Sequence, residues 1–244
     1  MLVLPATPDT VAGFMAKAAA APEGLSTIAN VMPAPPMPFL PKELHGSLVI
    51  LAMLAYAGET EEADNAIAPF RALAEPLADM VKAMPYPEMF PPEDPNYHPT
   101  AVARTLFLRS FDRESAETML RHLQEADGMR VAQLRVLGGA AARVAPDATA
   151  YAHRQQPIMA NVAAFYDGAD DRVRRTAWVE AFATGLARGE TAAYVNFLGN
   201  EGEARVRAAY PGATWDRLAQ VKAKYDPDNL FRLNQNIPPA ATTV

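Results

Sequence analysis

The sequence of 244 residues contains no cysteine, and this absence removes several classes of chemistry. The chain cannot form disulfides, use a thiolate nucleophile or bind zinc or iron–sulfur clusters through cysteine. The first residues also lack the basic stretch of a secretory signal, and Pro5 and Asp9 interrupt their short apolar run. A chain without cysteine suits a reducing compartment, so we expect a cytoplasmic protein.

Positive charge and long apolar runs are scarce as well. The formal net charge is -6, whereas nucleic-acid binding needs a concentrated basic face. The longest apolar run, residues 48–57, is about half as long as a membrane-spanning helix requires. We therefore expect neither nucleic acid nor a membrane as a partner. With 50% hydrophobic and 20% charged residues, the chain has the composition of a folded domain.

The short catalytic and phosphate-binding motifs are missing too. The sequence has no Gly-Xaa-Ser-Xaa-Gly elbow, no P-loop and no dinucleotide-binding glycine loop, and Gly138-Gly139 alone is too little for one. The four histidines share no metal-ligand spacing, so we expect no metal site. The phosphates of any nucleotide cofactor would have to be held by residues outside this sequence.

The pattern of apolar residues and turn signals predicts an α+β fold. Strands and helices do not alternate strictly enough for a doubly wound sheet, and clustered strands indicate hairpins. We expect an antiparallel or mixed sheet with helices on one face and a helical C-terminal segment. The predicted strands are residues 25–32, 46–56, 101–110, 129–137, 148–154 and 158–166. The predicted helices are residues 8–21, 61–72, 76–84, 113–126, 173–186, 201–210 and 214–225.

The last fifty residues carry the most chemical information. Tyr194 and Asn196 alternate with Val195 and Phe197, so an extended segment would place the phenol and the amide on one face. Two such groups could meet a ring that needs hydrogen-bond partners. The spacing alone fits equally a structural tyrosine and asparagine that satisfy backbone groups.

The segment from Tyr194 to Pro239 resembles the C-terminal signature of the berberine bridge enzyme-like flavoproteins of the vanillyl-alcohol oxidase superfamily. Upstream, Tyr151 to Arg154 is similar to the family's Phe-Xaa-His-Arg strand, and residues 40–46 and 84–86 look like its bacterial branch. The C-terminal elements that carry the resemblance are Tyr194-Xaa-Asn196-Phe197, Trp215, Arg217, Leu218, Lys222, Asp226-Pro227, Asn229-Leu230-Phe231-Arg232 and Asn234-Gln235-Asn236-Ile237.

The resemblance implies that a domain is missing from these residues. Family members carry an N-terminal FAD-binding domain, which supplies most contacts to the pyrophosphate and the adenine. We expect residues 1–190 to be the substrate-binding domain and residues 191–244 the berberine-like segment that contacts the flavin and the FAD domain. The chain could be a fragment, a truncated reading frame or one subunit of a split enzyme. It would bind FAD incompletely and lack activity alone, and exposed apolar surface could make it a homo-oligomer.

The resemblance also implies roles for individual residues. Family members oxidise small-molecule alcohols, sugars or aromatic hydroxyls by hydride transfer to the flavin, and the tyrosine that corresponds to Tyr194 acts as base in several of them. An ordinary phenol has a pKa near 10, so a nearby cation or the flavin would have to activate it. Asn196 would lie near the flavin and fix its position. Asn161, which falls where the family often has Gln or Glu, would orient the substrate or be a core residue, while His153 and Arg154 are expected to be structural.

A second hypothesis comes from another class of protein. The chain could be a stand-alone α+β binding or interaction module that has kept the fold and lost the redox role. Flavin absorbance with and without an FAD-binding domain separates the two hypotheses.

Overall fold

Two helices begin at the capping residues that the sequence supplies. A computed structural model describes residues 1–90, 95–96 and 98–241. Helix α1 (Pro8–Ala19) has proline in its first turn, and the Thr7 hydroxyl accepts a hydrogen bond from the Thr10 amide at 3.1 Å. At helix α3 (Arg113–Glu125), the Asp112 carboxylate accepts from the Ser115 amide at 2.8 Å. Both helices were predicted, and local capping explains where they start.

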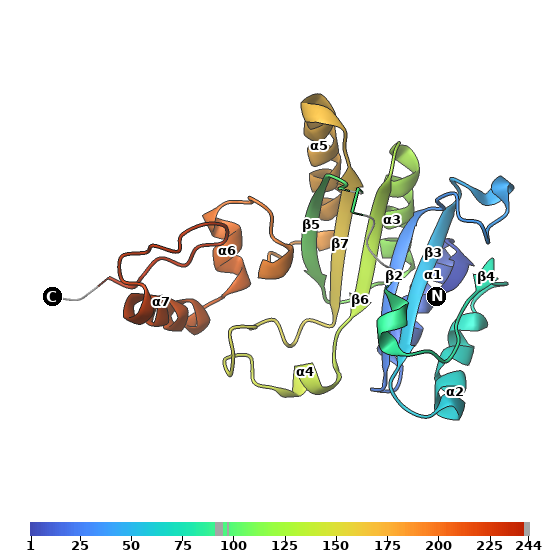
Figure 1. Ribbon diagram of the computed structural model, residues 1–244, viewed down its shortest axis with the longest axis horizontal. Helices are drawn as coiled ribbons and strands as arrows, with labels where there is room; N and C mark the ends of the chain where they lie inside the picture. The colour runs from blue at the N-terminus through green and yellow to red at the C-terminus, as the bar shows by residue number, and fades with distance from the viewer. Residues whose placement is uncertain (91–94, 97, 242–244) are drawn as a thin grey trace.

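The strands form one antiparallel sheet with the order β4-β1-β3-β2-β6-β7-β5 (Figure 1). This confirms the predicted α+β class. The strands are β1 (Leu2–Pro5), β2 (Leu25–Pro33), β3 (Leu48–Tyr56), β4 (Ala78–Asp79), β5 (Ala101–Leu108), β6 (Arg130–Val136) and β7 (Ile158–Phe165).

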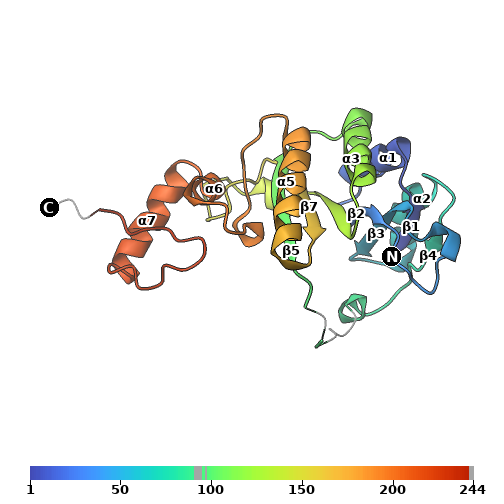
Figure 2. The ribbon, with the colours of Figure 1, turned by 90° about the horizontal axis from the view of Figure 1, so that it is seen from above.

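One face of the sheet is covered by α1, α3 and α5 (Gly168–Ala187), which lie along the same side in Figure 2. Their apolar stripes and the facing strand residues make the main core, in which Phe14, Met119 and Phe182 are almost fully buried. Burial of such a side chain contributes about 2–3 kcal/mol. Helix α2 (Thr60–Arg71) packs beside α1, where the Phe14 and Phe70 rings meet edge to face at 4.9 Å.

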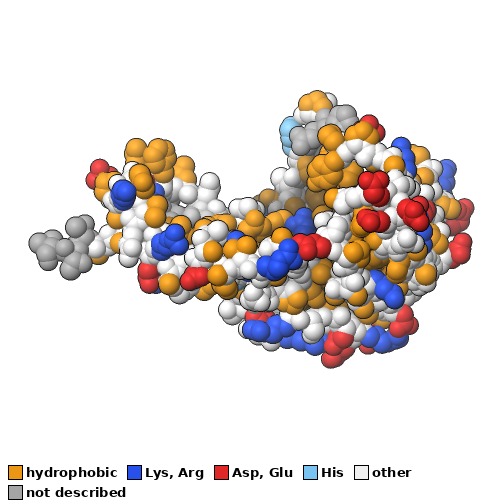
Figure 3. Space-filling view, turned by 90° about the horizontal axis from the view of Figure 1, so that it is seen from below, with side chains coloured by type: hydrophobic (Ala, Val, Ile, Leu, Met, Phe, Trp, Pro, Cys, Tyr) orange, Lys and Arg blue, Asp and Glu red, His pale blue; other side chains and the backbone are white. Residues whose placement is uncertain are grey.

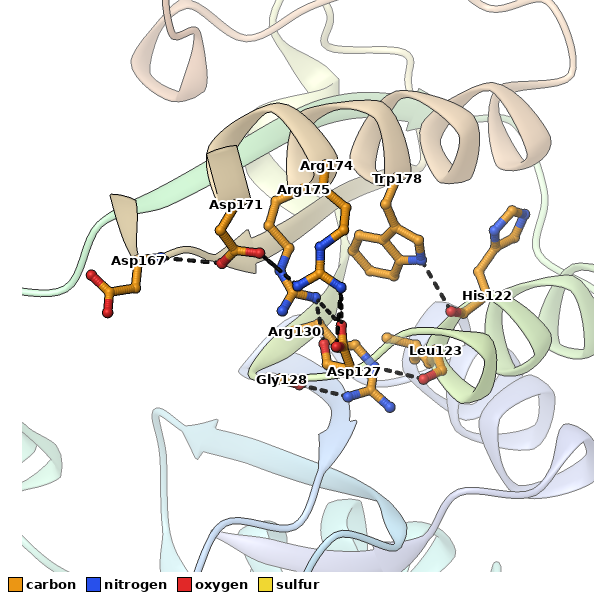
Figure 4. Close-up of polar contacts among 10 residues, drawn as sticks. All are labelled: His122, Leu123, Asp127, Gly128, Arg130, Asp167, Asp171, Arg174, Arg175 and Trp178. Atoms are coloured by element: carbon orange, nitrogen blue, oxygen red, sulfur yellow. Dashed lines mark hydrogen bonds and ion pairs between the residues drawn. The ribbon is translucent and has the colours of Figure 1, made fainter. Parts of the chain in front are cut away.

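A charged cluster fastens α5 to the turn between α3 and β6 (Figure 4). Arg175 is 7% exposed and donates to the Asp127 backbone carbonyl at 2.6 Å and to its carboxylate at 2.7 Å. Arg174 also pairs with Asp127, and the Trp178 indole donates to the His122 carbonyl at 3.2 Å. Each contact satisfies a charge or polar group that α5 brings against the core.

On the opposite face, Phe107 of β5 is buried against the His153 ring, and a second cover lies over β1 and β3. There, residues 34–47 pack Ala34 and Leu40 against Val3, Val49 and Leu51. This proline-rich segment thus provides part of the cover that the second face of the sheet requires. Farther along the sheet, over β2, β6 and β7, the face carries partly exposed polar side chains. The candidate site residues described below lie on and beside this open face.

The C-terminal part forms a second, smaller body at the β5 side of the sheet. Figure 1 shows α6 (Glu203–Ala209) and α7 (Ala213–Tyr225) projecting away from the strands. A separate apolar cluster holds this part together, with Ala193, Leu198 and Trp215 at its centre. Its residues belong to the stretch 191–244 that the sequence analysis expects to be the berberine-like segment. The domain boundary at residue 190 stays a prediction.

Two predicted elements are wrong, and two strands were not predicted. Residues 76–84 form no helix, because Ala78 and Asp79 instead pair with Val3 and Leu2 of β1. Neither β1 nor β4 was expected, since both are short and depend on each other and on β3. Residues 148–154 form no strand; His153 and Arg154 instead contact the backbone carbonyls of Ala208 and Ala141.

Candidate functional site

Tyr194 and Asn196 lie together at the start of the C-terminal part. The Asn196 side-chain amide donates a hydrogen bond to the Tyr194 hydroxyl at 2.9 Å. Val195–Phe197 forms a single turn of 3-10 helix, so the expectation of an extended, alternating segment is wrong. The turn nevertheless brings the two polar groups into contact. Tyr194 is half-buried and Asn196 is exposed, which leaves the amide accessible to a ligand.

Aromatic rings fix the orientation of the Tyr194 phenol. Its ring meets Tyr151 edge to face at 5.5 Å and Phe197 at 5.8 Å between centroids. Burial, followed by the neighbouring Tyr194, raises the pKa of Tyr151, and the same two causes raise the pKa of Tyr210. Both neighbouring phenols therefore stay protonated at neutral pH.

A buried carboxylate ties this segment to the edge of the sheet. Glu201, whose side chain is 8% exposed, pairs with Arg104 of β5 and with Arg205 of α6. Arg205 also donates to the Thr191 carbonyl at 2.7 Å and to the Thr105 carbonyl at 2.9 Å. We call Glu201, Arg104 and Arg205 the edge clamp. It satisfies an edge-strand carbonyl and holds the Tyr194 segment against β5.

Four polar side chains cross the open face of the sheet in a row. They are matched in register on adjacent strands, because Gln133 lies opposite both Asn30 and Asn161, and Asn161 lies opposite Thr105. Gln133 Nε2 donates to Asn30 Oδ1 at 2.7 Å, and the Thr105 hydroxyl donates to Asn161 Oδ1 at 3.1 Å. Asn30 Nδ2 donates onward to the Leu51 carbonyl at 3.2 Å. We call these residues the polar row.

The polar row leaves two groups free at its centre. Within the part of the chain that the structure describes, Asn161 Nδ2 and Gln133 Oε1 have no hydrogen-bond partner. One is a donor and the other an acceptor, and both belong to half-buried side chains. The sequence analysis singled out Asn161 alone, and the structure records no hydrogen bond between it and the Tyr194–Asn196 pair. Its predicted role therefore stays a prediction.

Arg135 completes the open face and was not predicted. It lies two residues after Gln133 on β6, so both side chains project from the same face. Its guanidinium lies over the Phe197 ring at 5.0 Å, and burial lowers its pKa while the neighbouring Tyr194 opposes this effect. Periodicity could have shown that Arg135 and Gln133 share a face, but only the sheet order reveals that Tyr194 is near.

His153 and Arg154 hold loop backbone in place. His153 is buried, and its Nε2 lies 3.1 Å from the Ala208 carbonyl of α6. Burial lowers the pKa of His153, whereas contacts with backbone carbonyls raise it. Arg154 donates to the Ala141 carbonyl at 2.9 Å and to Thr149 at 2.8 Å. These contacts match the structural roles expected for both residues.

Within residues 1–90, 95–96 and 98–241, no three histidine, aspartate or glutamate side chains gather in a way that could hold a metal ion. Over the same residues, no helix combines the length and the apolar character needed to cross a bilayer.

The fold and the site define a class of domain: an antiparallel sheet with one helix-covered face, one open polar face and a tyrosine–asparagine pair at its edge. Solved structures share this fold. Xylooligosaccharide oxidase from Myceliophthora thermophila C1 matches with a TM-score of 0.70 and 20% identity, over 99% of this chain and 55% of that one. A 6-hydroxy-D-nicotine oxidase from Arthrobacter nicotinovorans matches with a TM-score of 0.74 and 15% identity, over 97% and 53%.

Sequence comparisons give the family. Residues 193–238 match the family model "Berberine and berberine like". The uncharacterized FAD-linked oxidoreductase YgaK of Bacillus subtilis (strain 168) is 31% identical over 206 residues, which are 82% of this chain and 45% of that protein. The chain is thus a relative of the berberine bridge enzyme-like FAD-linked oxidoreductases, as its motifs indicated, and it spans about half the length of the relatives it matches.

Proposed function

We propose that the chain is the substrate-binding half of an FAD-dependent oxidoreductase that oxidises an alcohol, a sugar or an aromatic hydroxyl. The observation that carries this proposal is the Tyr194–Asn196 pair, held beside an open polar sheet face within the berberine-like segment. An FAD-binding domain, in cis or in trans, would complete the enzyme. The names of the oligosaccharide and nicotine oxidases that share the fold support small organic substrates.

The residues on this side of the site suit a flavin ring, which needs hydrogen-bond donors and acceptors. The exposed Asn196 amide uses its nitrogen for Tyr194, and its Oδ1 has no partner among the described residues. Asn229 Oδ1 and Asn236 Oδ1 are buried without a partner. Both carbonyl oxygens thus bear the cost of burial without a hydrogen bond. We assign Asn196 and Tyr194 to the flavin-facing side of the site.

Tyr194 and Asn161 have separate tasks in this proposal. A bound flavin supplies a two-electron acceptor for the hydride that leaves the substrate carbon. Tyr194 takes the proton of the substrate hydroxyl, so that the C–O bond becomes a carbonyl. Asn161 cannot act as a base, and its free Nδ2 orients a substrate oxygen.

The C-terminal residues 191–244 would form the contact with the FAD domain. Leu230, Phe231 and Leu233 are 72%, 78% and 85% exposed, which is unusual for three apolar residues so close in sequence. Figure 3 shows apolar side chains gathered on this projecting part, with a hollow between it and the sheet. An FAD domain seated in that hollow would cover both. We place the assembled enzyme in the cytoplasm, in keeping with the cysteine-free sequence.

Substitution of Tyr194 tests the catalytic assignment. The chain is combined with an FAD-binding half, and turnover of sugar and alcohol substrates is measured for the unchanged chain and for Tyr194→Phe. Loss of the base should lower kcat by about 100-fold or more while flavin absorbance stays unchanged. Full turnover in Tyr194→Phe would contradict the assignment. Failure of any FAD-binding half to give flavin binding would favour the stand-alone binding module.

A further inference from the structure

Arg135 is a half-buried cation on the open face that has no ion-pair partner. Among the described residues no carboxylate lies within 4.0 Å of its guanidinium, and none of its N–H groups donates a hydrogen bond. The neighbouring arginines differ: Arg104 pairs with Glu180 and Glu201, and Arg130 donates to the carbonyls of Leu123 and Gly128. Partial burial of the Arg135 charge is therefore not offset by an ion pair or hydrogen bond, as it is for Arg104 and Arg130.

The surroundings of Arg135 leave its donor edges available. Its contact is with the face of the Phe197 ring, which attracts the cation but uses no N–H group. The side chains that share its face on β6 and β7, Gln133 and Asn161, carry no charge, and the neighbouring Tyr194 is a phenol. A planar guanidinium with free edges matches a carboxylate, which it can bind through two parallel hydrogen bonds.

We propose that Arg135 anchors a carboxylate of the substrate, so that the enzyme oxidises a hydroxy acid rather than a neutral alcohol. The free donor and acceptor of the polar row, Asn161 Nδ2 and Gln133 Oε1, lie one step along the same face and bind hydroxyl groups of this substrate. Tyr194, beside Arg135, faces the hydroxyl that is oxidised. This inference rests on the proposed function but concerns a binding contact made by this chain alone.

The test uses two matched pairs of probes that differ in one carboxylate. D-galacturonate is compared with D-galactose, and mandelate with 1-phenyl-1,2-ethanediol, by isothermal titration calorimetry on the 244-residue chain at pH 7. In at least one pair the acid should bind roughly 10- to 100-fold more tightly than the neutral probe, as expected for a charge-assisted contact. This preference should weaken as salt is added.

Arginine variants identify the residue responsible. Arg135→Met should abolish the preference for the acid, and Arg135→Lys should keep part of it. Arg172→Met is the matched control, because Arg172 also lies over an aromatic ring, Tyr166 at 5.9 Å, but on helix α5. Equal binding within both pairs, no binding of either acid at millimolar concentration, or an unchanged preference in Arg135→Met would each overturn the proposal. A reconstituted enzyme that turns over neutral sugars better than acids would overturn it while leaving the proposed function intact.

Discussion

A single glycine allows the buried arginine of α5 to reach its partners. Gly128 has φ of +66°, a left-handed conformation that other residues adopt at a cost. A Cβ atom at this position would lie 2.7 Å from Arg175 Nη2. The turn between α3 and β6 thus needs glycine for its conformation and for the space it leaves.

Gly128→Ala is therefore expected to destabilise the chain by about 1–3 kcal/mol, because backbone strain and displacement of Arg175 act together. The free energy of unfolding is measured by urea denaturation. Gly199→Ala serves as the control, since a Cβ there meets nothing within 4 Å and its φ is not positive. A loss no greater than that of the control would show that Arg175 can move without cost.

Stability should fall as the pH drops below about 6.5, the ordinary pKa of histidine. Burial lowers the pKa of His153, so the unfolded chain binds a proton more readily than the folded chain. The loss begins near pH 6.5 and continues until the pH reaches the lowered pKa. Urea unfolding at pH 7, 6 and 5 measures it, and His153→Gln should show a smaller decrease. An identical decrease in the free energy of unfolding of the unchanged chain and of His153→Gln would exclude His153 as the cause. His122 would then be the next candidate, because burial also lowers its pKa.

The residues of the site differ in how far sequence could predict them. Tyr194 and Asn196 were identified from a linear motif, and the contact between them follows from local chain geometry. Asn161 was also singled out, but the polar row as a whole and Arg135 could not be predicted, because their residues come from strands far apart in sequence. Their association depends on the order β2-β6-β7-β5, which no local pattern specifies.

At the scale of elements, the edge clamp joins the Tyr194 segment to the sheet. Glu201 contributes a buried carboxylate whose Oε1 has no hydrogen-bond partner, while its other oxygen serves two arginines. Arg104 and Arg205 are each about a quarter exposed, so water screens part of their charge. The clamp is thus the main polar contact that fixes the position of Tyr194 relative to β5.

Glu201→Gln should loosen this connection and lower the free energy of unfolding by about 1–3 kcal/mol, because Arg205 loses its carboxylate and Arg104 keeps only the exposed Glu180. Hydrogen–deuterium exchange should increase in residues 191–210 while α1 and α3 stay protected. Glu180→Gln is a suitable control, since Glu180 pairs with Arg104 from the exposed side. Equal exchange in both variants would indicate that the clamp does not position the segment.

Elements were predicted well where capping and periodicity act locally, as in α1, α3, β2 and β3. The failures have a common physical origin. Residues 78–79 become a strand because the outer edge of β1 is open to them, whereas His153 and Arg154 contact the carbonyls of Ala208 and Ala141 instead of pairing with a strand. Strand formation thus depends on available partners, which sequence periodicity does not report.

At the scale of the whole molecule, the exposed apolar residues of the C-terminal part suggest an incomplete assembly. Replacement of Leu230, Phe231 and Leu233 by serine should reduce self-association of the isolated chain, because the apolar surface that drives it is removed. Light scattering after size exclusion measures the effect. Val173→Ser removes a similarly exposed residue from α5 and should have little influence. A triple variant that associates as strongly as the original would show that these residues are not the contact surface.

The central claim is that this chain completes a flavin site which it cannot form alone. The most direct measurement is the visible absorption spectrum of the purified chain with FAD, in the presence and absence of a co-expressed FAD-binding half of a relative. We predict that the complex of the two retains FAD and is reduced by substrate, and that the chain alone retains none. Stable FAD binding by the isolated chain, or a complex whose flavin no alcohol or sugar can reduce, would contradict the account.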